Sequence, residues 1–445
     1  MKYIIYLLFV ITCIKVNAQQ TYSITGKVGD EKGTPLTEAT VFIANTQKVT
    51  STNKEGKFIL EGLQPGVYDV AVKLLGYEST IHTVKLPNLG ITINIALKET
   101  SIALNAVTIN VHDLNRAKRL QLFLENFIGE TVNAQQCKLL NPGAIGFHFD
   151  IKTNVLHASA NDLLIVENKA LGYKIKYLLT DFEYNYNNGF CVVGGAPYFE
   201  ILNGSAVQQK KWEENRKVVY LSSARHFFRA LVNNTLQREG FLVYMIAKVS
   251  TPVNRLKNND EITVRYRAEA DGASGYWMTY LKLKRPQKEY TGAAIRIKDD
   301  TVKWLTAFQL KETDTLFIKG DTVVKILTSK PKTIGSVIIP REDTIALRYL
   351  YIVYLGEKES PLFSKTGTPV ELYPFLNSLL SKQQKRQRQV STLQPMADTV
   401  KINSNGTLTP AKGFMHTGYW AWQRIADLTP LDYFVDPPEG KSNKP

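Results

Sequence analysis

The stretch from Thr52 to Lys73 reads TNKEGKFILEGLQPGVYDVAVK, and it decides how the first part of the chain folds. Its segments 53–56 and 64–66 are typical of tight turns, because asparagine, glycine and proline supply the backbone angles that turns require. In residues 68–72 apolar side chains occupy alternate positions, a period of two that gives a β-strand one buried face. Short strands of this kind, separated by such turns, predict a small β-sandwich over residues 21–98.

Four motifs occur in order within this region, and together they resemble a known family. They read GKVGD from Gly26, GTPL from Gly33, TNKEGKF from Thr52 and LQPGVY from Leu63. The region resembles a carboxypeptidase-regulatory-like domain. The resemblance implies a transthyretin-like seven-stranded β-sandwich that serves as a scaffold and carries no zinc ligand. Residues 104–109 also resemble the short strand that follows this module in envelope proteins of the Bacteroidetes.

The first residues of the chain predict export. Lys2 precedes an apolar run over residues 3–14, which is too short to cross a bilayer as a mature helix. Small residues then stand at the positions before Gln19 that a signal peptidase reads. We therefore expect residues 1–18 to be a signal peptide and the mature chain to be periplasmic, outer-membrane-associated or at the cell surface. An uncleaved N-terminal anchor is one alternative, and a lipoprotein modified at Cys13, after a poor lipobox at residues 10–12, is a minor one.

Composition and charge narrow the classes of partner. The chain has 445 residues, of which 44% are hydrophobic and 21% charged, and this composition is typical of globular proteins. Loss of Lys2 and Lys15 with the signal peptide lowers the formal net charge from +15 to +13. A basic protein of this kind is attracted to anionic surfaces such as lipid headgroups or acidic glycans. The basic residues are scattered and form no nucleic-acid motif, so we expect no nucleic acid partner.

The pattern predicts a mainly β protein with one α+β portion. We expect a linker at 99–113, an α+β domain at 114–250, a β-rich domain at 251–375, an exposed loop or linker at 376–412, a C-terminal docking segment at 413–436 and a polar tail at 437–445.

Three local features of the α+β domain follow from spacing. Helical periodicity predicts one helix from Asp113 to about Ile128, and a second over roughly 208–233 that Ser205 caps. The apolar side of a strand changes from odd to even positions between Leu178 and Asp181. A strand cannot change faces without an irregularity, so we expect a β-bulge there.

The search for catalytic chemistry finds no strong motif. None of the six histidines begins the paired spacing that a carboxypeptidase zinc site needs, and no nucleophile elbow or phosphate-binding loop occurs. We therefore predict no catalytic residue, no metal and no cofactor. His148, Asp150 and His157 could share the face of a hairpin, where hydrogen bonding is favoured over metal binding.

Two further sets of residues are candidates for a specific role. Cys137 and Cys191 could form a disulfide in an oxidising compartment, or they could be two small buried apolar side chains. Aromatic side chains beside amides can stack on sugar rings, although aromatic residues at period two also fill the core of a sheet. The candidate ligand contacts of this kind are Tyr184, Tyr186, Trp277 and Tyr280.

Taken together, these patterns predict a non-enzymatic, exported envelope protein. Its sandwich would be an interaction or scaffold module, and its other domains would bind an envelope protein or a glycan. A glycan- or peptidoglycan-binding protein is one alternative. A hydrolase with a site assembled from distant residues is the other.

Overall fold

The computed structural model describes residues 21–100, 115–233, 235–252, 262–267, 278–285, 288–298, 301–310, 314–319, 322–328, 344–370, 380–386, 388–397, 400–403 and 405–435. For the strands between residues 245 and 348, only the backbone and its strand pairing are described. The predicted signal peptide, the tail at 437–445, most of the linker and two single residues, Asp113 and Trp277, lie outside this part of the chain. The chain divides into two compact units, unit 1 at residues 1–107 and unit 2 at residues 108–445.

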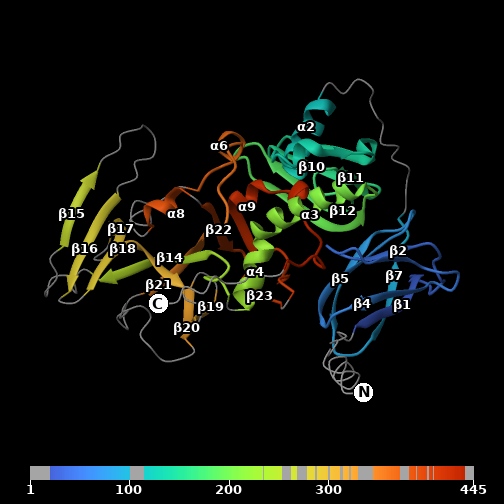
Figure 1. Ribbon diagram of the computed structural model, residues 1–445, viewed down its shortest axis with the longest axis horizontal. Coiled ribbons are helices and arrows are strands. Elements are labelled where there is room, and N and C mark those ends of the chain that lie inside the picture. Colours follow the sequence, from blue (N-terminus) through green and yellow to red (C-terminus); the bar gives the residue numbers. More distant parts are fainter. Residues whose placement is uncertain are drawn as a thin grey trace, which may run out of the picture. The chain divides into compact units, whose positions relative to one another are not determined.

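Unit 1 is a sandwich of seven strands, as predicted (Figure 1). The strands are β1 (Tyr22–Asp30), β2 (Thr40–Ile43), β3 (Val49–Ser51), β4 (Lys57–Leu63), β5 (Gly66–Lys73), β6 (Thr80–Leu86) and β7 (Ile91–Leu97). One sheet has the order β4-β1-β7 and the other β3-β2-β5-β6. Alternate side chains of the strands point inward and form a single apolar core, which includes Ile24, Val41 and Val72.

A glycine turn joins β3 to β4 within the stretch that decides the fold. The Asn53 side-chain oxygen accepts hydrogen bonds from the backbone N–H groups of Glu55 and Lys57, at 3.1 and 2.8 Å. Gly56 has a φ of +72°, and a Cβ there would lie 2.5 Å from the carbonyl oxygen of Val28. Only glycine therefore fits this position without a shift of the backbone.

Unit 2 begins with one helix and a six-stranded sheet. These elements are α2 (Arg116–Phe127), β8 (Cys137–Leu139), β9 (Ile145–Asp150), β10 (Val155–Ala160), β11 (Leu164–Asn168), β12 (Tyr173–Asn185) and β13 (Cys191–Ile201). The sheet order is β8-β11-β12-β10-β9, and β13 pairs with β12. The register between β12 and β13 shifts between Leu179 and Asp181, which confirms the predicted bulge. Phe123 and Phe127 of α2 pack on the sheet in one core.

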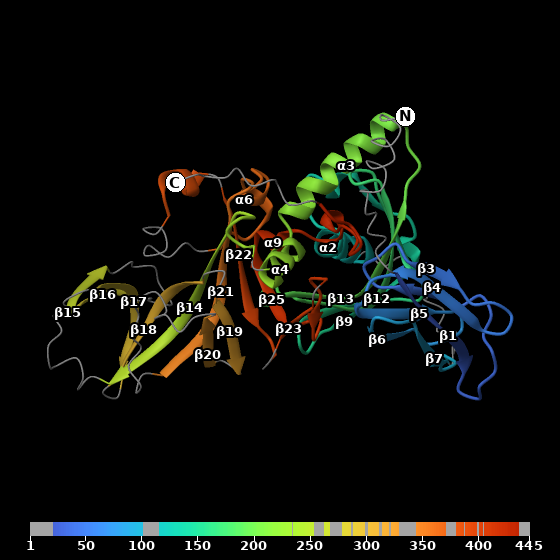
Figure 2. The ribbon, with the colours of Figure 1, turned by 60° about the horizontal axis from the view of Figure 1, so that its bottom comes forward.

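The second predicted helix is in fact two helices, α3 (Ala206–Leu221) and α4 (Ala224–Val232), so the prediction of one helix over 208–233 is wrong (Figure 2). Ser205 caps α3 as expected, in a reciprocal pair of hydrogen bonds with Gln208. The break comes from two adjacent serines. The Ser223 hydroxyl donates to the carbonyl of Tyr220 and accepts from the backbone N–H of His226. Such local bonds replace helical ones, end the first helix and start the next.

A ten-stranded sheet follows the helices (Figure 1). Its strands are β14 (Phe241–Pro252), β15 (Ile262–Arg267), β16 (Met278–Arg285), β17 (Lys288–Lys298), β18 (Thr301–Leu310), β19 (Asp314–Lys319), β20 (Thr322–Thr328), β21 (Thr344–Tyr354), β22 (Gln389–Pro395) and β25 (Phe414–Gly418). β14 pairs with both β18 and β21, and the boundary expected between residues 250 and 251 falls inside it.

One segment that we expected to be exposed is a buried strand. Residues 382–396 were predicted to be a loop or linker, but they form a short helix, α8 (Lys382–Arg386), and the strand β22. The prediction failed because β22 buries polar side chains whose partners are distant in the sequence. The Ser391 hydroxyl accepts from the backbone N–H of Trp420 at 3.1 Å, and the Thr392 and Thr417 hydroxyls lie 2.6 Å apart.

The C-terminal segment packs onto the preceding fold, as its aromatic residues predicted. The remaining elements are α6 (Phe363–Thr366), β23 (Lys401–Ile402), β24 (Leu408–Thr409), α9 (Tyr419–Trp422) and a 3-10 turn at Ile425–Asp427. Ile425 and Ala426 complete the core between α2 and the six-stranded sheet. Trp420 packs on Phe227 of α4, with ring centroids 5.3 Å apart. Among the described helices, none has the length and apolar character of a membrane span.

Candidate functional site

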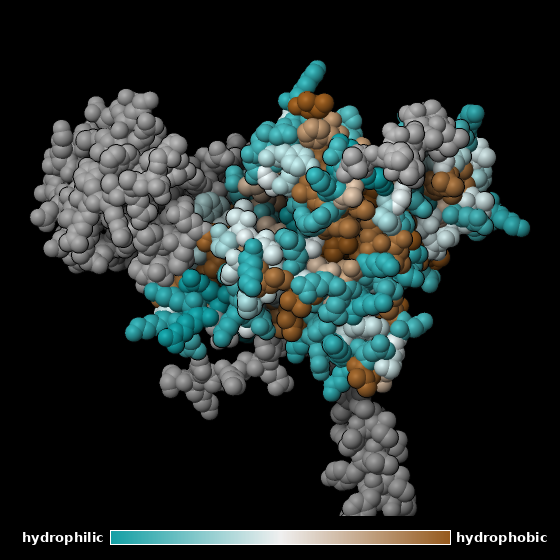
Figure 3. Space-filling model, turned by 90° about the horizontal axis from the view of Figure 1, so that it is seen from above, coloured by the Kyte–Doolittle hydropathy of each residue, from teal (hydrophilic) through white to brown (hydrophobic). Residues whose placement is uncertain are grey.

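Two neighbouring hairpin turns of unit 2 expose apolar side chains. One turn joins β9 to β10 and carries Ile151, which is 84% exposed. The other joins β12 to β13 and carries Tyr186 and Phe190, each 45% exposed. We call Ile151, Tyr186 and Phe190 the tip patch. On the face shown in Figure 3, hydrophobic residues likewise gather at a few places on a surface that is otherwise hydrophilic.

Hydrogen bonds and ring contacts hold the two turns side by side. The backbone N–H of Tyr186 donates to the carbonyl of Asn154 at 3.0 Å, and the Asn154 amide donates to the Asn187 side-chain oxygen at 2.7 Å. The Tyr186 ring lies edge-to-face with Phe149, at 5.7 Å between centroids, and with Tyr184, at 5.1 Å. The Tyr186 ring is therefore fixed by packing before any ligand arrives.

The polar groups of the turns are largely used within the turns. The side-chain oxygens of Asn185 and Asn188 accept from the backbone N–H groups of Asn187 and Phe190, at 2.8 and 2.9 Å. Asp150 accepts from the Lys152 N–H and the Thr153 hydroxyl, each at 2.8 Å. These bonds lower the pKa of the Asp150 carboxyl, the Thr153 hydroxyl having the largest effect. The tips thus present apolar surface over a backbone whose hydrogen bonds are made.

The structure brings together only part of the predicted aromatic set. Tyr184 and Tyr186 belong to one cluster, whereas Tyr280 lies on β16 of the ten-stranded sheet and Trp277 is outside the described residues. Sequence reasoning missed Phe149 and Ile151. Both lie where β9 runs into the turn before β10, and the sequence does not show that this turn lies beside the turn of Tyr186.

His148 and His157 lie opposite each other in the predicted hairpin, as neighbours on adjacent strands. His157 on β10 lies opposite His148 on β9 and Glu183 on β12. The His157 Nδ1 is 3.6 Å from a carboxylate oxygen of Glu183, and the two imidazole centroids are 6.2 Å apart. Within the described ranges, no three His, Cys, Asp or Glu side chains are arranged to hold a metal ion.

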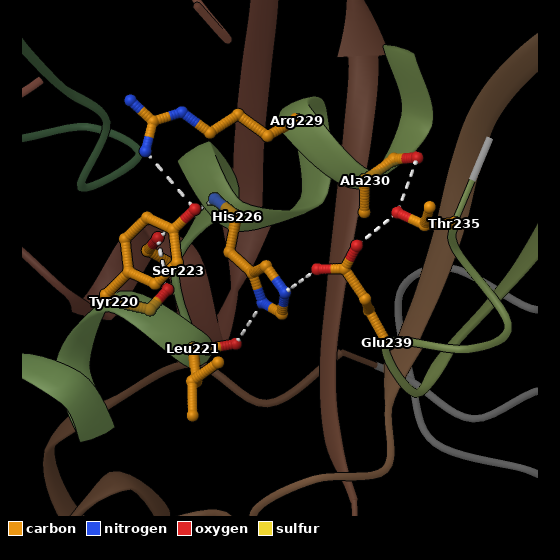
Figure 4. Close-up of polar contacts among 8 residues, drawn as sticks. All are labelled: Tyr220, Leu221, Ser223, His226, Arg229, Ala230, Thr235 and Glu239. Carbon is orange, nitrogen blue, oxygen red and sulfur yellow. Dashed lines mark hydrogen bonds and ion pairs between the residues drawn. The ribbon is translucent and has the colours of Figure 1, made fainter. Parts of the chain in front are cut away.

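The tightest histidine–carboxylate pair is enclosed in the core, between α4 and the turn that leads to β14 (Figure 4). The His226 Nδ1 lies 2.6 Å from the carbonyl oxygen of Leu221, and its Nε2 lies 2.6 Å from a carboxylate oxygen of Glu239. A carbonyl oxygen can only accept, so Nδ1 is a donor, and Nε2 and Glu239 share a proton. The second Glu239 oxygen accepts from the Thr235 hydroxyl.

This pair does not have the geometry of a general base. Such a base needs a nitrogen lone pair that faces a substrate. Both ring nitrogens of His226 are engaged, its side chain is 3% exposed, and Phe241 and Tyr354 cover the ring at 4.9 and 5.9 Å. The pair fastens α4 to the turn before β14.

Cys137 and Cys191, for which the sequence left a disulfide or two separate apolar side chains open, are free thiols in this structure. Both pack against the core that α2 covers, which is the second of the two predicted alternatives. Burial raises the pKa of Cys137 to about 12, and the nearby charge of Asp427 adds to the shift. Burial also raises the pKa of Cys191 to about 11. A thiol with such a pKa has little thiolate at neutral pH and is a poor nucleophile.

Buried charged groups of unit 2 hold the C-terminal segment in place. The Arg229 guanidinium donates to the carbonyls of Asn405, at 3.1 Å, and Tyr433, at 3.0 Å, and also to that of Leu431. Arg225, one turn earlier, donates to the carbonyl of Thr429. These arginines bind backbone oxygens, which is a structural role.

Comparisons with known proteins identify unit 1. Residues 24–109 match the family model described as "CarboxypepD_reg-like domain". A search among curated proteins found no match. Among solved structures, one match is the crystal structure of 3-chlorocatechol 1,2-dioxygenase from Rhodococcus opacus 1CP, at 12% identity and a TM-score of 0.16. The match covers 18% of this chain and 60% of that one, and a likeness of this size supports no conclusion about function. Unit 1 therefore contains a carboxypeptidase-regulatory-like β-sandwich, a non-catalytic module.

Proposed function

We propose that this protein is a non-enzymatic, exported envelope protein in which unit 1 is an interaction or spacing module and unit 2 carries the recognition surface. The observation that supports this proposal most is the tip patch, which exposes three large apolar side chains on turns whose polar groups are already bonded. Apolar surface of this kind on a rigid support is typical of a site that another molecule covers.

The chemistry of the buried groups supports a binding role over catalysis. Both nitrogens of His226 have partners. The thiols of Cys137 and Cys191 have raised pKa values. Burial and the charge of Arg424 lower the pKa of His416 to about 4, so this imidazole is neutral at physiological pH. His226 is enclosed in the core, and the two thiols and His416 are half-buried, with pKa values that leave them in their neutral forms.

A cross-linking experiment tests the binding role. A photoreactive benzoylphenylalanine at Phe190 should cross-link to one envelope component in living cells. The same probe at Val218, which is 51% exposed on α3, should give no product. Equal labelling by both probes, or none at position 190, would contradict the proposal.

Export is tested separately. N-terminal sequencing of the protein recovered from the envelope fraction should begin at Gln19, since cleavage is expected after Ala18. Recovery of the whole pool in the cytosol, with Met1 retained, would show that this part of the proposal is wrong.

Glycan binding remains a second candidate because Tyr184 and Tyr186 form one rigid cluster. Binding in a glycan array that Tyr186→Ala abolishes would support this function. Binding that survives the change would place the sugar elsewhere.

A further inference from the structure

We propose that the tip patch docks on the surface of an anionic membrane. The inference rests on the proposed binding role of unit 2 and names the class of its partner. The first step of the argument is composition. Turns are normally polar, yet one of these two places Ile151 at 84% exposure and the other exposes the rings of Tyr186 and Phe190. Aromatic rings and aliphatic side chains at the ends of hairpins suit the boundary between headgroups and acyl chains.

The second step is the free-energy cost of moving the two turns from water into the membrane. A backbone group that enters an apolar medium without a partner is strongly penalised. In these turns the N–H groups of Lys152, Asn187 and Phe190 each donate to a side chain within their own turn. The N–H groups of Asn185 and Gly189 donate to carbonyls, at 2.9 and 2.8 Å. Shallow insertion of the turns would therefore break few hydrogen bonds.

The same bonding argues against a sugar as the occupant. Recognition of a sugar needs amide and carboxylate groups that are free to bind its hydroxyls. Each of the side chains of Asn154, Asn185, Asn187 and Asn188 has at least one of its polar atoms bonded within the two turns, and only Asn187 has both bonded. The patch is rich in apolar surface and poor in available hydrogen-bonding groups.

The third step is charge. Residues 21–107 of unit 1 include eight basic and eight acidic side chains, so their formal charges cancel. The formal net charge of +13 that remains without residues 1–18 therefore belongs to unit 2. Exposed Lys152 follows Ile151 directly, and exposed Lys118 lies on α2. Arg119 of the same helix is close enough for its charge to act on Tyr186, whose pKa burial raises and this arginine lowers. Basic groups around an apolar tip complement anionic lipid headgroups.

The test uses the whole chain from residue 19 and vesicles of phosphatidylcholine with or without 30% phosphatidylglycerol. An environment-sensitive nitrobenzoxadiazole dye is attached to Ile151→Cys, and in a matched control to Val207→Cys. Val207 is 80% exposed on α3. The native thiols are half-buried and have raised pKa values, so they react more slowly than the new, exposed cysteine.

The expected result is a several-fold rise in dye emission at position 151 with the anionic vesicles, and none at position 207. Phe190→Ser should weaken vesicle binding by about tenfold, as expected for one large apolar side chain, and Val207→Ser should leave it unchanged. Raising the salt concentration should weaken binding through screening.

Three results would overturn the inference. If the protein does not sediment with anionic vesicles while the probe at Phe190 still cross-links to a protein, the binding role stands and the membrane is the wrong partner. If the protein binds vesicles but both dyes respond alike, the tip patch is not the docking site. If a soluble glycan binds and Phe190→Ser abolishes that binding, the occupant is a sugar.

Discussion

Replacing Asp427 with asparagine should change how the stability of unit 2 depends on pH. Asp427 lies in the 3-10 turn that closes the core of α2 and the six-stranded sheet. One of its carboxylate oxygens accepts from the Asn133 amide at 2.7 Å, and the other is buried and makes no direct hydrogen bond. Burial raises the pKa of this carboxyl from 3.8 to about 6, although Asn133 and the Thr131 hydroxyl oppose the shift.

The magnitude follows from this shift. The folded protein binds the Asp427 proton more tightly than the unfolded chain does. The protonated carboxyl therefore makes its full contribution to stability below pH 3.8. That contribution is lost as the pH rises from 3.8 to about 6 and stays lost above it. A shift of about two pKa units corresponds to about 3 kcal/mol. Asparagine at position 427 keeps an oxygen that can accept from Asn133, and it has no charge to bury. Its amide nitrogen replaces the carboxylate oxygen that makes no direct hydrogen bond. Burying that nitrogen without a partner costs about 1–3 kcal/mol.

Urea unfolding at pH 4 and pH 7.5, followed by tryptophan fluorescence, measures the effect. All five tryptophans belong to unit 2, so the signal reports on this unit. The difference in unfolding free energy between Asp427→Asn and the parent should be more favourable at pH 7.5 than at pH 4 by about 2 kcal/mol, because part of the full effect is already lost at pH 4. The exposed Asp150, whose pKa is lowered, provides the control, and Asp150→Asn should change the pH dependence in the opposite direction. Equal pH profiles for the parent and Asp427→Asn would refute the reasoning.

Three further predictions concern other parts of the chain. Gly56→Ala should destabilise the sandwich by about 1–2 kcal/mol or more, because alanine is strained at a φ of +72° and its Cβ would meet Val28; unchanged hydrogen-exchange protection in β1 and β4 would contradict this. Arg229→Lys should lose the forked contacts to the C-terminal segment, at about 1 kcal/mol for each bond, and should speed proteolysis within residues 405–433. A cleavage rate equal to that of the parent would show that the arginine does not hold this segment. Mass spectrometry without reduction should find Cys137 and Cys191 as two thiols that iodoacetamide modifies only after unfolding, and a mass two hydrogens lower would indicate the disulfide instead.

Sequence patterns predicted a structural feature correctly where its physical cause lies within a few neighbouring residues. The change of phase between Leu178 and Asp181 predicted the bulge, because side chains of a strand alternate strictly and a slip needs an extra residue. Ser205 predicted the start of α3, because an exposed cap bonds to its own first turn. We did not predict the break between α3 and α4 at Ser223. The two adjacent serines could have indicated it, because Ser223 bonds to Tyr220 and His226 in place of helical hydrogen bonds.

Patterns failed where polar residues are buried against distant partners. Gln389, Ser391 and Thr392 look like loop residues, yet they are buried in β22. Their partners are contributed by segments such as β25 and the start of α9, and nothing in their own neighbourhood predicts those contacts. The tip patch was only half predicted for the same reason. Tyr184 and Tyr186 were visible as a pair, but the turn that carries Ile151 meets theirs through contacts between two separate hairpins.

The amino-acid sequence by itself determined the sandwich of unit 1, because its turns and alternating strands are encoded within short segments and its motifs match one family over residues 24–109. It also determined the overall positive charge, which is a sum over residues and needs no fold. Only the tertiary structure decided which groups are available for chemistry. Burial and hydrogen bonding engage His226 inside the core and pack Cys137 and Cys191 against it, and strand pairing brings the turn after Ile151 beside that of Tyr186. These outcomes depend on contacts between segments far apart in the chain, whose energies no local pattern contains.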